Sequence, residues 1–245
     1  MRAVYSENQP PCNAFGANQQ PACLVPAVPD AATWVRLGLN LARAPFVRLF
    51  DQALPDGFIY KSEFISAEEE DSVLHIIRGL EFHEVRMHGV VARRRVIQYG
   101  WKYAFDGARL SEGPPLPDFM LPLRDRAAEL ASLESDALSE ALLTEYQPGA
   151  PIGWHRDAPG FGIVVGISLL SACRFRFRRG PERGSERISL TLEPRSAYVL
   201  SGPARTQWEH SIPEVDALRY SLTFRTLRPG ARSTKSPTPG ARSTR

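Results

Sequence analysis

The segment YQPGAPIGWHRD, residues Tyr146–Asp157, places an imidazole and a carboxylate two positions apart, at His155 and Asp157. If this segment is a strand, residues two apart point to the same face, so both side chains lean into one space. A neutral nitrogen ligand and an anionic oxygen ligand make up two thirds of the two-histidine, one-carboxylate triad, which holds non-haem Fe(II) and leaves coordination positions open. The pair alone also suits a solvated loop without a metal, so further donors are needed.

A second histidine and an alternating strand follow downstream. His210 lies in the segment QWEHSIP, and the run RYSLTFR, residues Arg219–Arg225, alternates strictly between polar and apolar side chains. This period predicts a strand with one apolar face, made of Tyr220, Leu222 and Phe224, and one polar face, made of Arg219, Ser221, Thr223 and Arg225. The polar face fits either an exposed sheet edge or the wall of a pocket, where the two guanidinium groups reach opposite ends of one small dianion.

Taken in order, these positions resemble the AlkB family of Fe(II)/2-oxoglutarate dioxygenases. The resemblance rests on Tyr146 before a Pro-Gly pair, on His155, Asp157 and His210, and on the two arginines six positions apart; it covers Leu54–Leu227. It implies that the two histidines and the aspartate ligate the metal and are the catalytic residues. It also implies Fe(II) as cofactor, with 2-oxoglutarate and O2 as co-substrates.

The same resemblance assigns residues to 2-oxoglutarate. Arg219 would clamp the distal carboxylate, Arg225 would lie by the co-substrate at the end nearest the iron, and Tyr146 would donate a hydrogen bond to it. Thr144 stands where the best-known members carry Asn, so it keeps a hydroxyl but loses an amide. Pro159 stands where some members carry an acidic residue that helps to read the damaged base.

An upstream segment mixes basic and aromatic residues: MHGVVARRRVIQYGWKY, residues Met87–Tyr103. Arginines meet phosphates and flat rings stack on bases, a combination typical of proteins that bind single strands. The Tyr-Gly pair in this segment resembles one that the AlkB family carries in the strand and loop over its active site. We therefore predict substrate contacts from Arg95, Tyr99, Trp101 and Tyr103. The alternative is a basic strand whose aromatic side chains pack in the core.

The remaining pattern predicts a β-rich domain with helices at its side. Ser66–Glu69 is a capping-box pattern that begins a helix ending near Gly79, and apolar spacing predicts another helix at Leu121–Leu133. Short strands between turn signals are predicted at Ala141–Tyr146, Ile163–Leu170, Cys173–Arg179, Ile188–Leu192 and Ala197–Leu200. Together with the resemblance, these elements favour an α+β protein built on a double-stranded β-helix, or jelly roll, with flanking N-terminal helices.

The composition is that of an ordinary soluble globular protein. Of 245 residues, 43 % are hydrophobic and 23 % charged, and the formal net charge of +3 permits a nucleic acid partner without demanding one. The three cysteines form no disulfide framework, and the chain shows neither a run of membrane-spanning length nor a secretory signal. We expect a cytoplasmic protein without membrane attachment, and we expect it to be a monomer.

Three segments are expected along the chain. Residues 1–50 are rich in Pro, Gln, Asn and Ala, which indicates a mostly disordered leader; the helical spacing of Trp34–Phe50 suits one short helix within it. Residues 51–228 are expected to form the AlkB-like dioxygenase domain. Residues 229–245 are expected to form a disordered basic tail.

The resemblance implies an oxidative demethylase that removes N-alkyl groups from nucleic acid bases, preferably in single strands, as in the repair of alkylation damage. The departures at Thr144 and Pro159 leave open an oxygenase that acts on proteins or small molecules. An alternative of another class is a nucleic-acid-binding module on an inactive oxygenase scaffold, although the complete set of ligands and arginines argues against it. A zinc hydrolase is a weaker alternative, since it would leave the arginine pair without a role.

Overall fold

The computed structural model describes residues 53–87, 90–104, 109–181 and 184–230. The chain divides into two units, Met1–Asp51 and Gln52–Arg245, and every described residue belongs to the second. The expected leader and nearly all of the expected tail lie outside the described residues. No helix in the described ranges is long and apolar enough to cross a membrane.

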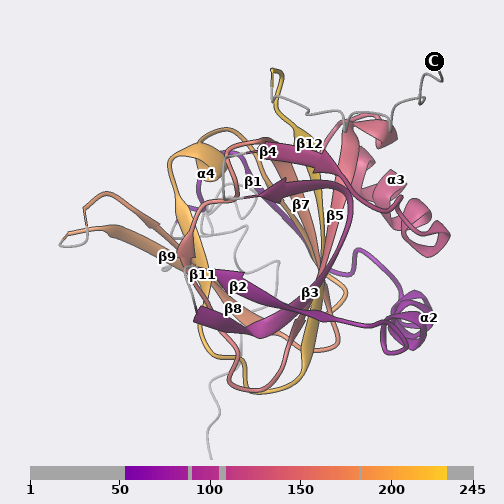
Figure 1. Ribbon diagram of the computed structural model, residues 1–245. Coiled ribbons are helices and arrows are strands. Elements are labelled where there is room, and N and C mark those ends of the chain that lie inside the picture. The colour runs from indigo at the N-terminus through magenta and orange to yellow at the C-terminus, as the bar shows by residue number, and fades with distance from the viewer. Residues whose placement is uncertain (1–52, 88–89, 105–108, 182–183, 231–245) are drawn as a thin grey trace, which may run out of the picture. The chain divides into compact units, whose positions relative to one another are not determined.

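Two antiparallel sheets form the domain (Figure 1). The larger has the order β1-β10-β7-β12-β5-β3-β2, with β4 paired to β3, and the smaller has the order β6-β11-β8-β9. The strands of the larger sheet are β1 (Phe58–Lys61), β2 (His83–Met87), β3 (Val90–Ala104), β4 (Arg109–Glu112), β5 (Leu138–Tyr146), β7 (Phe161–Leu169), β10 (Ala197–Leu200) and β12 (Arg219–Leu227). Those of the smaller sheet are β6 (Ile152–His155), β8 (Cys173–Arg179), β9 (Glu186–Leu192) and β11 (Glu209–Ile212).

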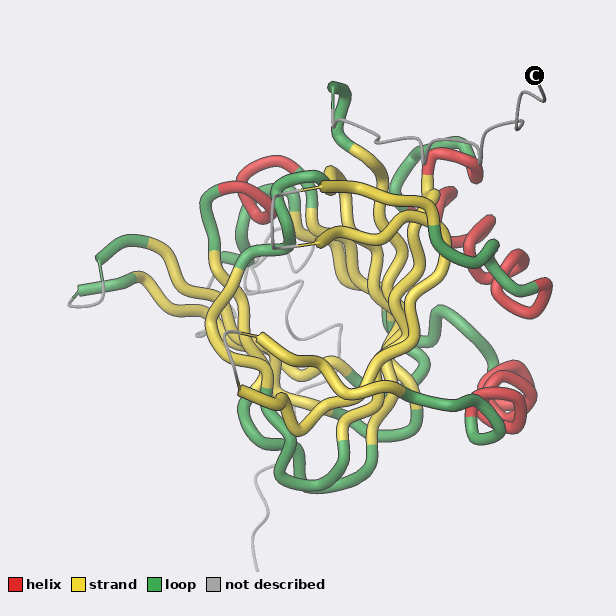
Figure 2. Tube along the Cα trace, in the orientation of Figure 1, coloured by secondary structure: helices red, strands yellow, loops and turns green. Residues whose placement is uncertain are grey.

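The two sheets curve around a common interior, as the strands in Figure 2 show. Each of the five short strands predicted from turn spacing is present, and β8 and β10 have the predicted bounds. This arrangement is the predicted double-stranded β-helix. Its larger sheet carries residues from both halves of the chain, so it can bring distant segments to one place.

Helices flank the outer face of the larger sheet (Figure 1). Helix α2 (Ala67–Ile77) begins at the predicted capping box: the Ser66 hydroxyl accepts from the Glu69 amide at 3.2 Å, and the Glu69 carboxylate accepts from the Ser66 amide at 2.8 Å. Helix α3 (Leu121–Leu130) ends three residues before its predicted end, because Ser132 adopts a φ of 55° that no helix tolerates. Short helical turns are α4 (Gly202–Thr206), η2 (Asp118–Met120) and η3 (Ser135–Ala137).

Strand β12 decides which side of the larger sheet is polar. It lies between β5 and β7, so it is an inner strand and the exposed-edge interpretation is wrong. Its apolar residues Tyr220, Leu222 and Phe224 are buried in one cluster with the apolar residues of α2 and α3. The polar residues therefore face the interior between the two sheets, as predicted for the wall of a pocket.

Candidate active site

The two histidines of the candidate metal site lie opposite each other on paired strands. His155 at the end of β6 is the register partner of His210 on β11, and their ring centroids are 4.3 Å apart. Nδ1 of His155 lies 2.8 Å from the carbonyl oxygen of Gly153. If Nδ1 donates in that contact, Nε2 is the ring nitrogen that remains available to a metal.

Asp157 reaches the same place from a loop. Strand β6 ends at His155, so the strand geometry expected from the sequence does not extend to Asp157. Its carboxylate is nevertheless only 5 % exposed, and Oδ2 lies 3.6 Å from Nε2 of His210. Within the described residues no three His, Cys, Asp or Glu side chains already have the spacing of a closed metal cluster. The three donors are gathered at one point, and side-chain adjustment would be needed to close them around an ion.

The electrostatics keep these groups in the protonation states that a metal requires. Burial, together with the neighbouring His155, lowers the pKa of His210 to about 3. Burial also lowers the pKa of His155. For Asp157, burial opposes ionisation, but Arg225 and the other nearby cationic groups outweigh it and hold the pKa well below its ordinary value. Two neutral imidazoles and one carboxylate anion are the forms that ligate Fe(II).

One oxygen of Asp157 is occupied and the other is free. Oδ1 accepts a hydrogen bond from Nε of Arg225 at 2.8 Å, and Nη2 of the same guanidinium lies 2.8 Å from it in an ion pair. Oδ2 is buried and has no hydrogen-bond partner among the described residues. A buried, unpaired carboxylate oxygen is costly, and a metal cation beside the histidines would satisfy it. This oxygen is the first sign that the donor set fits an ion.

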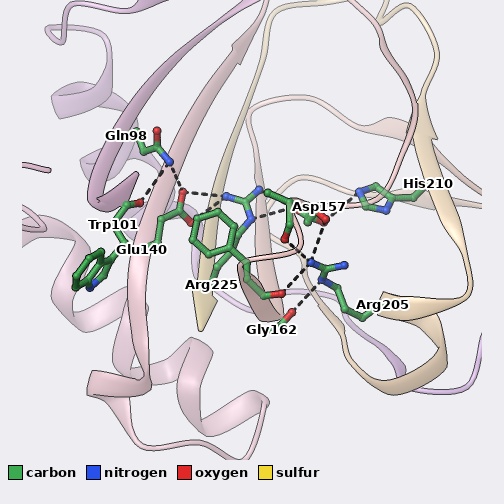
Figure 3. Close-up of polar contacts among 10 residues, drawn as sticks. Gln98, Trp101, Glu140, Asp157, Gly162, Arg205, His210 and Arg225 are labelled. Carbon is green, nitrogen blue, oxygen red and sulfur yellow. Dashed lines mark hydrogen bonds and ion pairs between the residues drawn. The ribbon is translucent and has the colours of Figure 1, made fainter. Parts of the chain in front are cut away.

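Two further buried groups hold Asp157. Glu140 on β5 is fully buried, and its two carboxylate oxygens accept from Nη1 of Arg225 at 3.1 and 2.9 Å (Figure 3). Arg205 on α4 is 5 % exposed and donates to the carbonyl oxygens of Asp157, Ala158, Phe161 and Gly162 at 2.9–3.1 Å. The bonds to Glu140 hold Arg225, which pairs with the Asp157 side chain. The bonds from Arg205 hold the backbone of the loop that carries Asp157.

Arg219 lies at the other end of β12 and is the natural site for a carboxylate. It is 1 % exposed, its Nη2 donates to the Ser168 hydroxyl at 3.1 Å, and its guanidinium lies 5.1 Å from the centre of the Tyr146 ring. Its Nε and Nη1 are buried, and neither has a hydrogen-bond partner in the part of the chain that the structure describes. A guanidinium with two free donors in a buried pocket fits a dianion such as 2-oxoglutarate, which can take both bonds at once.

These groups line one pocket of about 430 Å³. Tyr146 and Thr144 of β5 are in its wall, as are all four polar residues of β12. The three candidate metal ligands also line it. The structure thus brings together every residue that the sequence assigned to metal and co-substrate. It differs for Arg225, whose three nitrogens all meet carboxylates of the protein, so it holds Asp157 and is not free to grip the second end of a dianion.

The predicted substrate residues divide into two groups. Tyr103 lines the pocket, and its ring centroid is 6.2 Å from that of Phe161. Arg95 pairs with Glu145 at 2.6 Å, and Tyr99 packs against the cluster of the outer helices. Both therefore lie on the wrong face of β3 for a substrate in this pocket, and the prediction is corrected for them. Trp101 lies beyond Gly100 and is outside the pocket lining.

Four polar residues of the site were not found from the sequence: Gln98, Glu140, Ser168 and Arg205. Glu140 had a usable signal if the predicted strand Ala141–Tyr146 is extended by one residue, because positions 140, 142, 144 and 146 then share one face and the last two were already assigned. Arg205 had none, since it contacts a loop 44 residues away in the chain.

A jelly roll with two histidines, an aspartate and a pair of inward arginines defines a class of enzyme, and comparison with family models agrees. Residues 66–225 match the 2OG-Fe(II) oxygenase superfamily, so the chain belongs to it. The protein is an Fe(II)- and 2-oxoglutarate-dependent dioxygenase, an oxidoreductase that also consumes O2.

Within the superfamily the chain is similar to AlkB homologues. It is 28 % identical over 220 residues to bovine (Bos taurus) DNA oxidative demethylase ALKBH2, covering 82 % of this chain and 75 % of that protein. It is 34 % identical to the human protein of the same name over 144 residues, 52 % of this chain and 53 % of that one. It also matches the Macaca fascicularis tRNA (carboxymethyluridine(34)-5-O)-methyltransferase ALKBH8 at 27 % identity, covering 76 % of this chain but only 28 % of that protein.

Solved structures show the same fold. OsALKBH1 aligns with a TM-score of 0.56 at 15 % identity, covering 71 % of this chain and 99 % of that one. A 2OG-Fe(II) oxygenase family oxidoreductase from Burkholderia pseudomallei aligns with a TM-score of 0.52 at 17 % identity, covering 73 % and 89 %. The family match and the similarity to ALKBH2, together with this shared fold, confirm the predicted resemblance to the AlkB family.

Proposed function

We propose that this dioxygenase is an oxidative demethylase that removes N-alkyl groups from nucleic acid bases, preferably in single strands. The observation that carries the substrate class is the similarity to ALKBH2, a protein named as a DNA oxidative demethylase, along most of the described chain. The pocket agrees with a flat substrate, because Tyr103 and Phe161 bring two aromatic rings to its wall. Arginines at positions 94 and 156 also line it and carry charge suited to a phosphate backbone.

The residues of the chain have separable tasks in this reaction. His155, Asp157 and His210 would hold the Fe(II), which supplies the activation of O2 when it is bound. Arg219 would take the distal carboxylate of 2-oxoglutarate on its two free nitrogens, with Tyr146 stacked on its guanidinium. A methyl group on nitrogen that gains a hydroxyl separates into formaldehyde and the free amine, so oxidation alone completes the demethylation.

The apolar lining of the pocket keeps water away from the site, which favours oxidation of the substrate over side reactions with water. Leu142, Val164 and Phe175 line the pocket between the polar groups and are partly or fully buried. Apolar walls exclude water and strengthen the charged contacts inside. A base inside a duplex would have to be turned out of the helix to reach the metal, which favours single strands as substrates.

The test begins with anaerobic Fe(II) and 2-oxoglutarate, followed by visible absorption for the weak charge-transfer band of the bound pair. Air and an N-methylated single-stranded oligonucleotide are then added, and the product is measured by mass spectrometry. His155→Ala and Arg219→Ala are expected to lose the band and the demethylation. Arg174→Ala, an exposed position on β8 outside the pocket lining, is the matched control and is expected to keep both.

Loss of one methyl mass per oligonucleotide, dependent on 2-oxoglutarate, is the expected outcome. A band without demethylation of DNA or RNA would overturn the nucleic acid substrate and direct the search to proteins or small molecules, which Pro159 at the base-reading position would favour. Protein that binds oligonucleotide but never Fe(II) or 2-oxoglutarate would instead indicate a binding module on an inactive scaffold.

A further inference from the structure

A fully buried acidic residue near the metal site has no part in the chemistry described so far. Glu140 is 0 % exposed, and it lies on β5 directly opposite Arg225 on β12. Burial raises the pKa of Glu140, while Arg225 opposes that change. Three donor contacts reach its two oxygens: Arg225 donates to both and Gln98 donates to Oε1 at 3.1 Å. This set of donors favours the carboxylate anion.

Figure 3 shows the polar row that Glu140 belongs to; it runs from Gln98 through Glu140, Arg225 and Asp157 to His210. The row crosses the interior from β3 of the larger sheet to β11 of the smaller sheet. Each link in the row is a contact of 2.8–3.6 Å. Glu140 therefore contacts the candidate metal ligand Asp157 only through Arg225.

The geometry of Arg225 in this row is unusual for an arginine beside a carboxylate. A guanidinium ordinarily binds both oxygens of a carboxylate in parallel, with one N–H for each oxygen. Here Nε and Nη2 both approach Oδ1 of Asp157, and Nη1 is turned to the two oxygens of Glu140. Oδ2 of Asp157 consequently receives no hydrogen bond from any described residue, and it faces His210.

We propose that Glu140 is a positioning residue that keeps Oδ2 of Asp157 available to the metal by anchoring Nη1 of Arg225, so that the Nε–Nη2 edge of the guanidinium stays on Oδ1. Without the Glu140 carboxylate, Arg225 has one charged partner, and its guanidinium turns so that Nε and Nη2 each bind one oxygen of Asp157. The oxygen that should ligate the metal is then occupied by a guanidinium N–H. Glu140 also raises metal affinity in a second way. Its negative charge offsets the positive charge of Arg225, so the Asp157 carboxylate attracts a metal cation more strongly.

The proposal rests on the proposed metal-binding role of Asp157, and it concerns metal affinity, which can be measured without turnover. Mutation of a residue that holds a metal ligand in place without touching the metal typically changes metal affinity by about 10- to 100-fold. Glu140→Gln keeps the shape of the side chain and removes its charge. We expect the dissociation constant for Co(II), titrated anaerobically into the metal-free full-length protein and followed by its visible absorption, to rise about tenfold.

The chain offers a matched control on the same strand. Glu145 is 4 % exposed and pairs with Arg95 at 2.6 Å, but it lies on the opposite face of β5, outside the pocket lining. Glu145→Gln removes an equally buried, arginine-paired charge, and its Co(II) affinity should stay within about twofold of the parent, a change too small to matter beside the tenfold expected above. Urea unfolding of both metal-free variants checks that they are folded. Glu140→Asp, whose shorter carboxylate retreats from Arg225, tests the same point if the glutamine variant is not soluble.

A double-mutant cycle separates positioning from general structure. If Glu140 acts through Arg225, then Glu140→Gln should have no effect on Co(II) affinity in an Arg225→Met background, because the group it restrains is gone. Equal losses in both backgrounds, or an unchanged affinity for Glu140→Gln alone, would overturn the proposal. Asp157→Ala in the same titration tests its premise: if that variant binds Co(II) like the parent, the metal-binding role of Asp157 fails, whereas loss there with no loss at Glu140 refutes only the positioning role.

Discussion

Arg219 is a single residue whose unmet hydrogen bonds give a direct prediction. Replacing it with Met removes both free donors, and hydrogen bonds to charged groups contribute about 1.5–3 kcal/mol each. We expect the affinity for 2-oxoglutarate to fall roughly 100-fold for Arg219→Met and about tenfold for Arg219→Lys, which keeps the charge but loses the fork. Isothermal titration of 2-oxoglutarate into anaerobic Co(II)-loaded protein measures this, with Arg174→Met as the control. Unchanged affinity in Arg219→Met would mean that the co-substrate lies elsewhere.

Arg205 gives a prediction about stability. Its guanidinium satisfies four carbonyl groups of the loop that carries Asp157. Arg205→Met removes all four bonds in a buried place. The Phe161 carbonyl would keep Arg228 and the Ala158 carbonyl would keep the Phe161 amide, so we expect the free energy of unfolding to fall by about 3 kcal/mol. Arg228→Met is the control, because the Arg228 side chain donates to the same Phe161 carbonyl but, in the described part of the chain, makes only that one hydrogen bond to the loop. Urea denaturation of the two variants should separate them; equal losses would show that the loop does not depend on Arg205.

At the scale of the residue, the sequence predicted those functional residues that can be identified by their spacing along the chain. His155 and Asp157 are two apart and Arg219 and Arg225 are six apart, so both pairs were visible in the sequence. The partners of these residues were not visible. Glu140 contacts Arg225 across 85 positions, and no local pattern specifies which of the many acidic residues would meet it.

At the scale of the element, period-2 alternation worked on strands without irregularities and failed on β3. Residues 94, 96 and 98 line the pocket, but beyond Gly100 the pocket-lining residue is Tyr103, so the phase changes by one. Gly100 has a φ of 72°, and its amide and carbonyl bond with Pro114 and Gly113 instead of continuing the ladder with β5. Because of this irregularity, Arg95 and Tyr99 lie on the helix side of β3 although Tyr103 lines the pocket. A strand that alternates without interruption would place all three side chains on one face, as was expected from the sequence.

Gly100 itself gives a prediction for its strand. A Cβ at this position would lie 2.1 Å from the backbone oxygen of Ser139, and the positive φ adds strain. We expect Gly100→Ala to lower the free energy of unfolding by about 3 kcal/mol, measured by urea denaturation. Gly180→Ala is the control, since Gly180 has a φ of 93° but no atom within 4 Å of the added carbon. If Gly100→Ala lowers the free energy of unfolding no more than Gly180→Ala does, the positive φ accounts for the whole effect and the close approach to β5 contributes nothing.

At the scale of the whole molecule, the site depends on the closure of two sheets. The larger sheet supplies Arg219, Arg225 and Glu140, and the smaller supplies His155 and His210. The order of the strands was not readable from the sequence, because pairing partners lie far apart along the chain. The resemblance to the AlkB family supplied that topology, whereas the residues alone predicted only short strands separated by turns.

The burial of two neutral histidines and one aspartate predicts how the stability of the whole metal-free molecule depends on pH. The pKa of His210 falls from 6.5 to about 3 on folding, so below pH 6.5 the unfolded chain binds a proton that the folded chain does not. Stability therefore decreases as pH falls from 6.5 toward 3, by up to about 1.4 kcal/mol per pH unit for this histidine. His155 acts in the same direction, since its pKa is also lowered. The lowered pKa of Asp157 adds a further loss below about pH 3.8.

Urea denaturation of chelator-treated protein between pH 4 and pH 7 measures this slope. Replacing both site histidines with Gln removes the groups that must take up protons on unfolding, so the double variant should show a shallower slope over that range even if it is less stable at pH 7. Saturating Co(II) should steepen the slope of the parent protein, because protons then compete with the metal for the same nitrogens. If the double variant kept the slope of the parent, the acid sensitivity would come from other groups, and His155 and His210 would not be the buried neutral imidazoles that a metal site requires.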